Sequence, residues 1–310
     1  MTTQLPDSWT LDSLVEAYKQ HQRRTRGLRD STLEGYDRVV RPLVREALGE
    51  NPIDPTHLSP SDVIEFVASI SGRWAPASMK VVRTALRSFF RFLRAQGLCD
   101  GRLEAAVPTV AHWRLSTLPR YLSGAQLQRV LTTLDLSTQC GDRDRAIVLC
   151  LATLGLRPSE VADLCLEDID WRDGAIRLRA RKSRRGAVLP LPREAGRAIA
   201  AYLRTERPPT GERRVFVKHL GPHRGEPISR HVVYYVAVRT LRRAEVETTL
   251  GGGAYTFRHT VASCMVQRGV SLKEVADFLG HRSIDTAAIY AKLDLPALGE
   301  VALPWPGVTP

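Results

Sequence analysis

The stretch FLGHRSIDTAAIYAKL, residues 278–293, places a lone tyrosine, Tyr290, nine residues after His281. Four apolar residues lie in the segment before the tyrosine: Ile284, Ala287, Ala288 and Ile289. Such neighbours are typical of an aromatic side chain packed in a helical core. A tyrosine hydroxyl can also be the nucleophile of an enzyme. The local sequence leaves both interpretations open, and only the rest of the chain can separate them.

Composition predicts a globular protein with a polyanionic partner. The chain has 310 residues, which is enough for two domains. Its 45 Lys and Arg residues exceed its 33 Asp and Glu residues, so the net charge is +12. This excess favours nucleic acid or an anionic membrane surface as the partner. No apolar run approaches the roughly 20 residues needed to span a bilayer, and the first residues lack the layout of a signal peptide.

The cysteines and histidines predict no metal site. The five cysteines are widely separated and form no CxxC pair, so we expect neither a disulfide framework nor a zinc site. This pattern fits a reducing cytoplasm. His219 and His223 are four residues apart, but Gly221 and Pro222 interrupt the helix that a zinc pair would need. We therefore expect no metal and no cofactor.

The pattern of apolar residues predicts two domains. Residues 9–112 are predicted to form helices, several of which begin after Ser, Thr or Asp in the N-cap position. The proline-containing stretch VPTVAHWRLSTLPR (107–120) has no sustained period, and we place the linker at 113–122. Residues 123–310 are predicted to be mostly helical, with a trailing tail at 293–310. Their one predicted hairpin joins AIRLRA (175–180) to AVLPL (187–191) through the basic turn RKSRRG.

One predicted helix of the first domain, in APASMKVVRTALRSFFRFLRAQG (75–97), has a strongly basic face. Five basic residues fall within about an 80° arc of a helical wheel: Lys80, Arg83, Arg87, Arg91 and Arg94. The opposite side is apolar, and no acidic residue occurs between residues 66 and 99. Because like charges on one face repel, phosphates would relieve this arrangement. We predict that this face contacts DNA.

Two segments of the second domain contain residues suited to phosphate chemistry. In LGLRPSEVADLCLEDID (154–170), Gly155 can end one helix and Pro158 can begin the next, which puts Arg157 at the junction. In the predicted hairpin turn, Lys182 lies among three arginines: Arg181, Arg184 and Arg185. Arginine can only stabilise negative charge, whereas lysine can also act as a general acid. The turn is suited to phosphate contact and proton delivery, but its composition equally fits a solvated basic loop.

A third segment, GGGAYTFRHTVASCMVQRG (251–269), begins a helix with Tyr255, Arg258 and His259. Helix N-termini attract anions, and Arg258 would add a full positive charge. Taken separately, each of these motifs also fits an ordinary structural role. Their order and spacing along the chain, ending in Tyr290, favour a shared chemical site.

These motifs together resemble those of the tyrosine recombinase (phage integrase) family, which includes the Xer-type and Cre-type enzymes and the integron integrases. The resemblance covers the whole second domain and is weaker in the first, where it rests on position and basicity. It implies a fold that is mainly α with a small β-hairpin. The domains would be a helical, SAM-like core-binding domain at 9–112 and an α+β catalytic domain at 123–310.

The resemblance implies that Tyr290 is the nucleophile, which would form a 3′-phosphotyrosyl link to cut DNA and release a 5′-hydroxyl. It assigns the other catalytic positions to these residues: Arg157, Glu160, Lys182, Arg258 and His281. Lys182 would protonate the leaving oxygen, and the arginines and His281 would stabilise the transition state. Glu160 is expected to orient Arg157 or Lys182, since a carboxylate repels phosphate.

The sequence departs from the family pattern at Tyr255, which stands where a histidine is usual. A phenol with an unperturbed pKa of about 10 is poorly suited to accept the nucleophile's proton at neutral pH. His259 directly follows Arg258, so we expect it to point elsewhere and to pack or bond locally. The departure leaves open whether the enzyme is slow, uses another base or is weakened, and it favours an enzyme of a mobile element.

The resemblance also implies partners and a location. They are double-stranded DNA recombination sites, further copies of the chain in a tetramer on DNA, and a related recombinase, with no membrane partner. The location would be cytoplasmic and nucleoid-associated. Two other functions stay open: a DNA-binding protein on the same fold with weak or no catalysis, and a relaxing enzyme like type IB topoisomerases. The tail after Tyr290 is expected either to dock on a neighbouring copy or to fold on its own domain.

Overall fold

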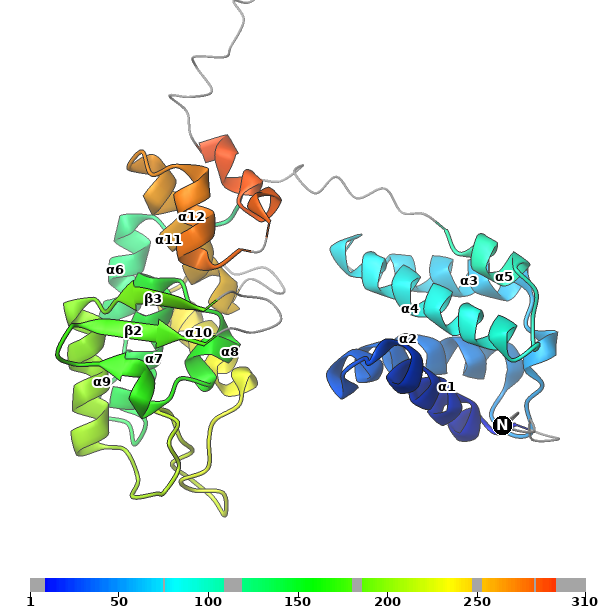
Figure 1. The fold of residues 1–310 in the computed structure, drawn as a ribbon, viewed down its shortest axis with the longest axis horizontal. Coiled ribbons are helices and arrows are strands. Elements are labelled where there is room, and N and C mark those ends of the chain that lie inside the picture. The colour runs from blue at the N-terminus through cyan, green and yellow to red at the C-terminus, as the bar shows by residue number, and fades with distance from the viewer. Residues whose placement is uncertain are drawn as a thin grey trace, which may run out of the picture. The chain divides into compact units, whose positions relative to one another are not determined.

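The computed structural model describes residues 9–74, 76–108, 119–179, 186–246, 253–281 and 283–293 (Figure 1). The chain divides into two compact units, Met1–Arg114 and Leu115–Pro310. Most of the predicted linker and of the predicted tail, and the basic hairpin turn with Lys182, lie outside the described residues. No helix within the described ranges is long and apolar enough to cross a membrane.

The first unit is helical, as predicted. Its elements are α1 (Leu11–Arg26), α2 (Asp30–Leu48), the 3₁₀ turn η1 (Pro55–His57), α3 (Pro60–Ser71), α4 (Pro76–Ala95) and α5 (Arg102–Ala106). Capping boxes begin two of them: Thr10 with Ser13 at α1, and Ser59 with Asp62 at α3. Inside, the ring of Tyr18 meets that of Phe89 edge to face, with centroids 5.4 Å apart. The apolar side of α4 therefore faces the core of this unit.

The second unit combines helices with a small sheet. Its helices are α6 (Gly124–Thr132), α7 (Gly141–Leu154), α8 (Pro158–Ala162), α9 (Arg193–Thr205), α10 (Arg230–Arg243), α11 (Gly253–Gln267) and α12 (Leu272–Leu279), with the 3₁₀ turns η2 (Leu166–Asp168), η3 (Ile284–Thr286) and η4 (Ala288–Leu293). The sheet is antiparallel in the order β1 (Ile169–Asp170), β2 (Ala175–Leu178) and β3 (Ala187–Pro190). The predicted hairpin is confirmed, with Leu178 opposite Ala187. Strand β1 is not predicted by the sequence, because two residues show no alternation.

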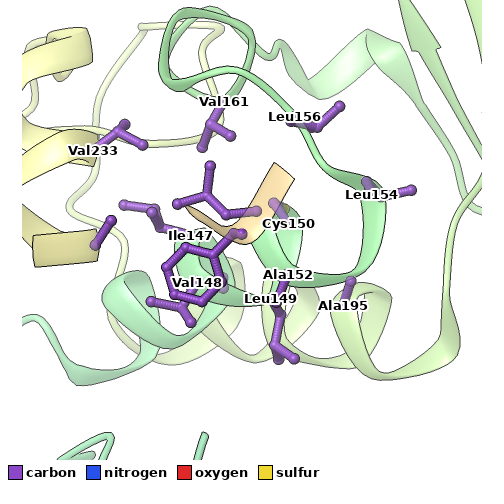
Figure 2. Packing of buried hydrophobic residues seen from close by; sticks show 14 of the residues in the cluster. Ile147, Val148, Leu149, Cys150, Ala152, Leu154, Leu156, Val161, Ala195 and Val233 are labelled. Carbon is purple, nitrogen blue, oxygen red and sulfur yellow. The ribbon is translucent and has the colours of Figure 1, made fainter. Parts of the chain in front are cut away.

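Helix α7 forms the centre of this unit. Nearly all of its residues are buried, as expected for a helix that is covered on every side. Figure 2 shows Ile147 and Cys150 of α7 among side chains from three other helices: Val161 of α8, Ala195 of α9 and Val233 of α10. The unit is thus built around one buried helix, and the segments that follow α7 and α8 are held on this core.

A buried ion cluster ties the start of α7 to α10. Asp144 accepts hydrogen bonds from Arg143 at 3.0 and 2.9 Å and also pairs with Arg239. Both Arg143 and Asp144 are buried. Glu206, just after α9, accepts the backbone N–H of Arg143 at 2.7 Å and so satisfies a free amide of the first turn of α7. These contacts fix the positions of α7, α9 and α10 relative to one another.

Helix α11 links this core to the end of the chain. It packs against α7 and α10 and also against α12 and η4. Figure 1 shows α11 and α12 in orange, lying side by side. The fold class predicted from the sequence, mainly α with a small sheet in two domains, is confirmed, and α11 occupies the position where the motifs of the second domain can meet.

Candidate active site

The junction between α7 and α8 positions Arg157. Gly155 ends α7 in the left-handed conformation, with φ of 60°, and Pro158 begins α8. Arg157 occupies the N-cap of α8, where its backbone N–H and its Nη1 donate to Glu160 at 2.8 and 2.9 Å. Glu160 is buried, and the side chain of Arg157 is 17% exposed. Glu160 thus holds the guanidinium of Arg157 in place, which is one of the two arrangements expected for it.

Arg258 connects the turn before Arg157 with the turn before His281. It lies on α11, is 3% exposed, and donates from Nη1 to the carbonyl of Gly155 at 2.8 Å and from Nη2 to the carbonyl of Leu279 at 2.6 Å. The two carbonyls belong to segments more than 100 residues apart in the chain. One buried guanidinium therefore joins the RPSE, RHT and LGH motifs at a single place.

The two turns also touch directly. A Cβ built on Gly155 would come within 2.9 Å of the Leu279 side chain, so glycine is needed there for its positive φ and for this close approach. After Leu279, Gly280 ends α12 with φ of 63°, and the backbone N–H of His281 donates to the carbonyl of Ala276 at 2.7 Å. His281 is thereby anchored at the end of α12, beside the junction that carries Arg157.

Tyr290 lies in η4 and forms a hydrogen bond with His259. The distance between its hydroxyl oxygen and Nδ1 of His259 is 2.8 Å, and the two ring centroids are 5.7 Å apart. Tyr290 is only 2% exposed. The expectation that His259 packs or bonds locally is therefore wrong, because its partner Tyr290 is 31 positions away in sequence. Arg258 and His259 do diverge, as neighbours on a helix must, but the direction that His259 takes is the one that leads to η4.

The electrostatics of this pair follow from burial. Loss of solvent raises the pKa of Tyr290 to about 12, and the positive charge of Arg258 opposes this shift in part. Burial, followed by the charge of Arg258, lowers the pKa of His259 below its usual value. The pair at neutral pH is thus a protonated phenol beside a neutral imidazole, with the charge of Arg258 acting on both.

Tyr255 is the outlying member of the predicted set. It lies in the first turn of α11, three residues before Arg258, and is 47% exposed. Residues three apart share one face of a helix, so Tyr255 is on the same side of α11 as Arg258. Lys182 and the turn arginines Arg181, Arg184 and Arg185 lie outside the described residues, and their assigned roles stay predictions.

The basic face of α4 is partly neutralised within the first unit. Glu104 of α5 lies 2.6 Å from Nη2 of Arg91 and 3.9 Å from Nη1 of Arg94. Glu104 therefore relieves the expected repulsion among the basic side chains at the C-terminal end of α4. The helical pattern of α4 could not predict this contact, because Glu104 lies on another helix. Lys80 and Arg83 have no ion pair within the described part of the chain, and Nε of Arg87 is buried there without a hydrogen-bond partner. The DNA contact predicted for this face stays a prediction.

The two histidines considered for a metal have other partners. Nδ1 of His219 lies 2.8 Å from the carbonyl oxygen of Gln139, and Nδ1 of His223 lies 2.8 Å from Oε1 of Glu226. Among the described residues, no group of three or more His, Cys, Asp or Glu side chains is arranged to hold a metal ion.

Comparison with known proteins adds independent information. The sequence profile of the Phage integrase family matches residues 120–295, and that of the Phage integrase, N-terminal SAM-like domain, matches residues 15–97. A putative integrase/recombinase of Sinorhizobium fredii, y4rA, is 42% identical over 293 residues, which are 94% of this chain and 71% of the relative. Tyrosine recombinase XerA of Thermococcus kodakarensis is 29% identical over 242 residues, which are 78% of this chain and 80% of the relative.

Two solved structures share the fold. The XerH site-specific recombinase bound to its palindromic difH substrate, in a post-cleavage complex, matches with a TM-score of 0.71 at 19% identity, over 94% of this chain and 83% of that one. A lambda integrase tetramer bound to a Holliday junction matches with a TM-score of 0.68 at 18% identity, over 98% of this chain and 81% of that one. At such low identity these matches support the fold alone.

The chain belongs to the phage integrase family, the tyrosine recombinases. This membership confirms the class of enzyme that the sequence motifs predicted, a tyrosine site-specific recombinase, and the SAM-like and catalytic domains expected for it. Sequence reasoning missed His259 as a partner of Tyr290. The available signal was the histidine directly after Arg258 in a chain whose usual histidine is replaced by Tyr255.

Proposed function

We propose that the protein cuts and rejoins double-stranded DNA at specific sites through a covalent 3′-phosphotyrosyl intermediate on Tyr290. The observation that carries this proposal is the meeting of three motifs at Arg258. Its guanidinium bonds to the carbonyls beside Arg157 and His281, while its charge acts on the Tyr290 hydroxyl. A nucleophile beside clustered cationic groups is the arrangement that phosphoryl transfer requires.

The reaction exchanges one phosphodiester bond for another, so the energy of the bond is not lost by hydrolysis. The Tyr290 oxygen bonds to phosphorus and passes its proton to a base, while the bond from phosphorus to the 5′-oxygen breaks. Arg157, Arg258 and His281 stabilise the charge on the non-bridging oxygens, and Lys182 protonates the leaving 5′-oxygen. Rejoining reverses these steps. The arginines supply the positive charge that metal ions supply in other phosphoryl-transfer enzymes, so neither a metal ion nor ATP enters the scheme.

Glu160 acts through Arg157 in this scheme. Its carboxylate is bonded to both the backbone and the side chain of Arg157, which keeps the guanidinium oriented when no phosphate is present. Positioning of this kind reduces the reorganisation needed when charge develops in the transition state.

DNA recombination sites and further copies of the chain are the partners that fit this function. Support comes from the basic charge of both parts of the sequence and from the solved relatives, XerH bound to difH and a lambda integrase tetramer on a Holliday junction. A tetramer on two DNA sites, joined in some systems by a related recombinase, brings four tyrosines to one exchange. Such a protein works in the cytoplasm on the nucleoid.

A covalent-capture experiment tests the proposal and recovers the target sequence together. The protein is incubated with a nicked, randomised duplex library and denatured in SDS, and the DNA attached to a peptide containing Tyr290 is sequenced. We expect an adduct on Tyr290 that is absent in Tyr290→Phe, although this variant still binds the library. DNA binding without any adduct would overturn the proposal in favour of a binding protein on this fold.

The recovered sequence then separates recombination from relaxation. A recombinase exchanges strands between two copies of the recovered site and resolves a Holliday junction built from them. A relaxing enzyme forms the same adduct but yields only relaxed circles, which would exclude the site-specific exchange proposed here.

A further inference from the structure

His259 is in direct contact with Tyr290, the proposed nucleophile. The hydroxyl oxygen of Tyr290 is 2.8 Å from Nδ1 of His259, which is the distance for direct transfer of a proton. The two residues are 31 positions apart in sequence, and η4 packs directly on α11. The hydrogen bond is therefore produced by the tertiary packing of the catalytic domain.

The orientation of His259 follows from the helix that carries it. Consecutive helical residues point about 100° apart, so one turn of α11 presents Arg258 and His259 in two directions. Arg258 is directed to the carbonyls of Gly155 and Leu279, and His259 is directed to η4. Adjacent positions of the same helix thus supply the hydrogen-bond partner of the Tyr290 hydroxyl and the charge proposed to bind phosphate.

The protonation states of the pair suit proton transfer from the phenol. His259 is deprotonated at neutral pH, because burial and the charge of Arg258 lower its pKa below the ordinary value of about 6.5. Its Nδ1 can therefore accept a hydrogen bond. Tyr290 is protonated, because burial raises its pKa to about 12. A phenol so hard to ionise needs a base in contact with it. Arg258 is the charged group that acts on both residues.

Tyr255 is unsuited to this task. It is 47% exposed, and within the described residues the hydroxyl of Tyr290 bonds to His259 and not to Tyr255. The chain therefore lacks a base at the position where its family usually has one, while it has an imidazole in contact with the nucleophile.

We infer that His259 is the general base of DNA cleavage, accepting the phenolic proton of Tyr290 at Nδ1. The inference rests on the proposed function and deepens it. In cleavage the Tyr290 oxygen bonds to phosphorus while its proton moves to His259, the bond to the 5′-oxygen breaks, and Lys182 gives that oxygen a proton. In rejoining, the 5′-hydroxyl returns its proton to Lys182 and attacks phosphorus, and the imidazolium of His259 returns a proton to the departing Tyr290 oxygen.

The test compares His259→Asn with the wild-type chain. An asparagine amide oxygen can accept the hydrogen bond near the position of Nδ1 but cannot take up a proton, so it separates positioning from proton transfer. The probe is the nicked, randomised duplex pool, and the readout is the single-turnover rate of Tyr290 adduct formation from acid to alkaline pH. His223→Asn, at an exposed histidine bonded to Glu226, is the matched control.

We expect His259→Asn to slow adduct formation at neutral pH by roughly 10² to 10⁴-fold, the usual contribution of a general base. The wild-type rate should be level above the pKa of His259. The variant rate should rise about tenfold per pH unit, because it then depends on the small phenolate fraction of Tyr290. Imidazole in the buffer should partly restore His259→Ala.

A substrate with sulfur at the 5′-bridging position adds a second readout. Its thiolate leaves without protonation, so it should restore cleavage by Lys182→Ala but not by His259→Asn. Denaturant unfolding and binding to the pool confirm that each variant is folded.

Three results would overturn the inference. An unchanged rate and pH profile in His259→Asn would reduce His259 to a positioning residue. Faster cleavage by His259→Ala would make the hydrogen bond a restraint that keeps Tyr290 buried. If the sulfur substrate restored the cleavage rate of His259→Asn, the role of His259 would be to protonate the leaving oxygen. If the wild-type chain forms no adduct, both the proposed function and the inference are wrong. If the wild-type chain forms the adduct and His259→Asn forms it at the same rate, only the inference is wrong.

Discussion

Replacement of Arg258 by lysine tests whether one guanidinium holds the catalytic motifs together. The arginine donates two charge-assisted hydrogen bonds, to the carbonyls of Gly155 and Leu279, from a site that is 3% exposed. Hydrogen bonds to charged groups contribute about 1.5–3 kcal/mol each, so the pair amounts to roughly 3–6 kcal/mol. Lysine keeps the charge but is not a planar fork, and it can satisfy one of the two carbonyls. We therefore expect Arg258→Lys to lose about 1.5–3 kcal/mol of local stability.

The assay should resolve this segment from the rest of the chain, because unfolding of a protein with two compact units need not be two-state. Amide hydrogen exchange followed by mass spectrometry reports the opening free energy of α11 and of the Gly155 and Leu279 turns. Arg268→Lys, at an exposed position just after α11, is the matched control and should leave exchange unchanged. Protection of the two turns that stays at the wild-type level in Arg258→Lys would refute the view that the guanidinium joins them.

Three further predictions concern activity, stability and pH. Tyr255→His should retain or raise the rate of adduct formation on the duplex pool, and a drop of about tenfold, which is 1.36 kcal/mol of barrier, would reveal a specific role for the phenol. Asp144→Ala should cost about 3–5 kcal/mol in denaturant unfolding, because it leaves the buried guanidinium of Arg143 without its partner; a small loss would show that Arg143 reaches solvent. Burial lowers the pKa of His219, so the unfolded chain binds a proton that the folded chain does not, and stability should fall as the pH drops below about 6.5. His219→Asn should remove this part of the pH dependence. The prediction would be wrong if the unfolding midpoint changed as much between acid and neutral pH in the variant as in the wild type.

Local patterns in the sequence determined the secondary structure and the class of enzyme. The apolar period of α4 predicted its buried face, and Gly155 predicted the junction after α7, because backbone conformation and helix period are properties of neighbouring residues. Alternation in the two hairpin strands was long enough to be recognised, whereas β1 was too short to show a period. The order of the motifs was sufficient to predict a tyrosine recombinase.

Only the tertiary structure decided which of these residues meet. The pairing of Glu104 with Arg91 joins two helices, and the bond between Arg258 and Gly155 joins residues 103 positions apart. The direction of His259 could not be predicted, because it depends on where η4 packs against α11. A helical period states the angle between neighbouring side chains but not what lies opposite each one. For this reason the sequence could predict Tyr290 as the nucleophile, whereas only the fold placed an imidazole within hydrogen-bond distance of its hydroxyl.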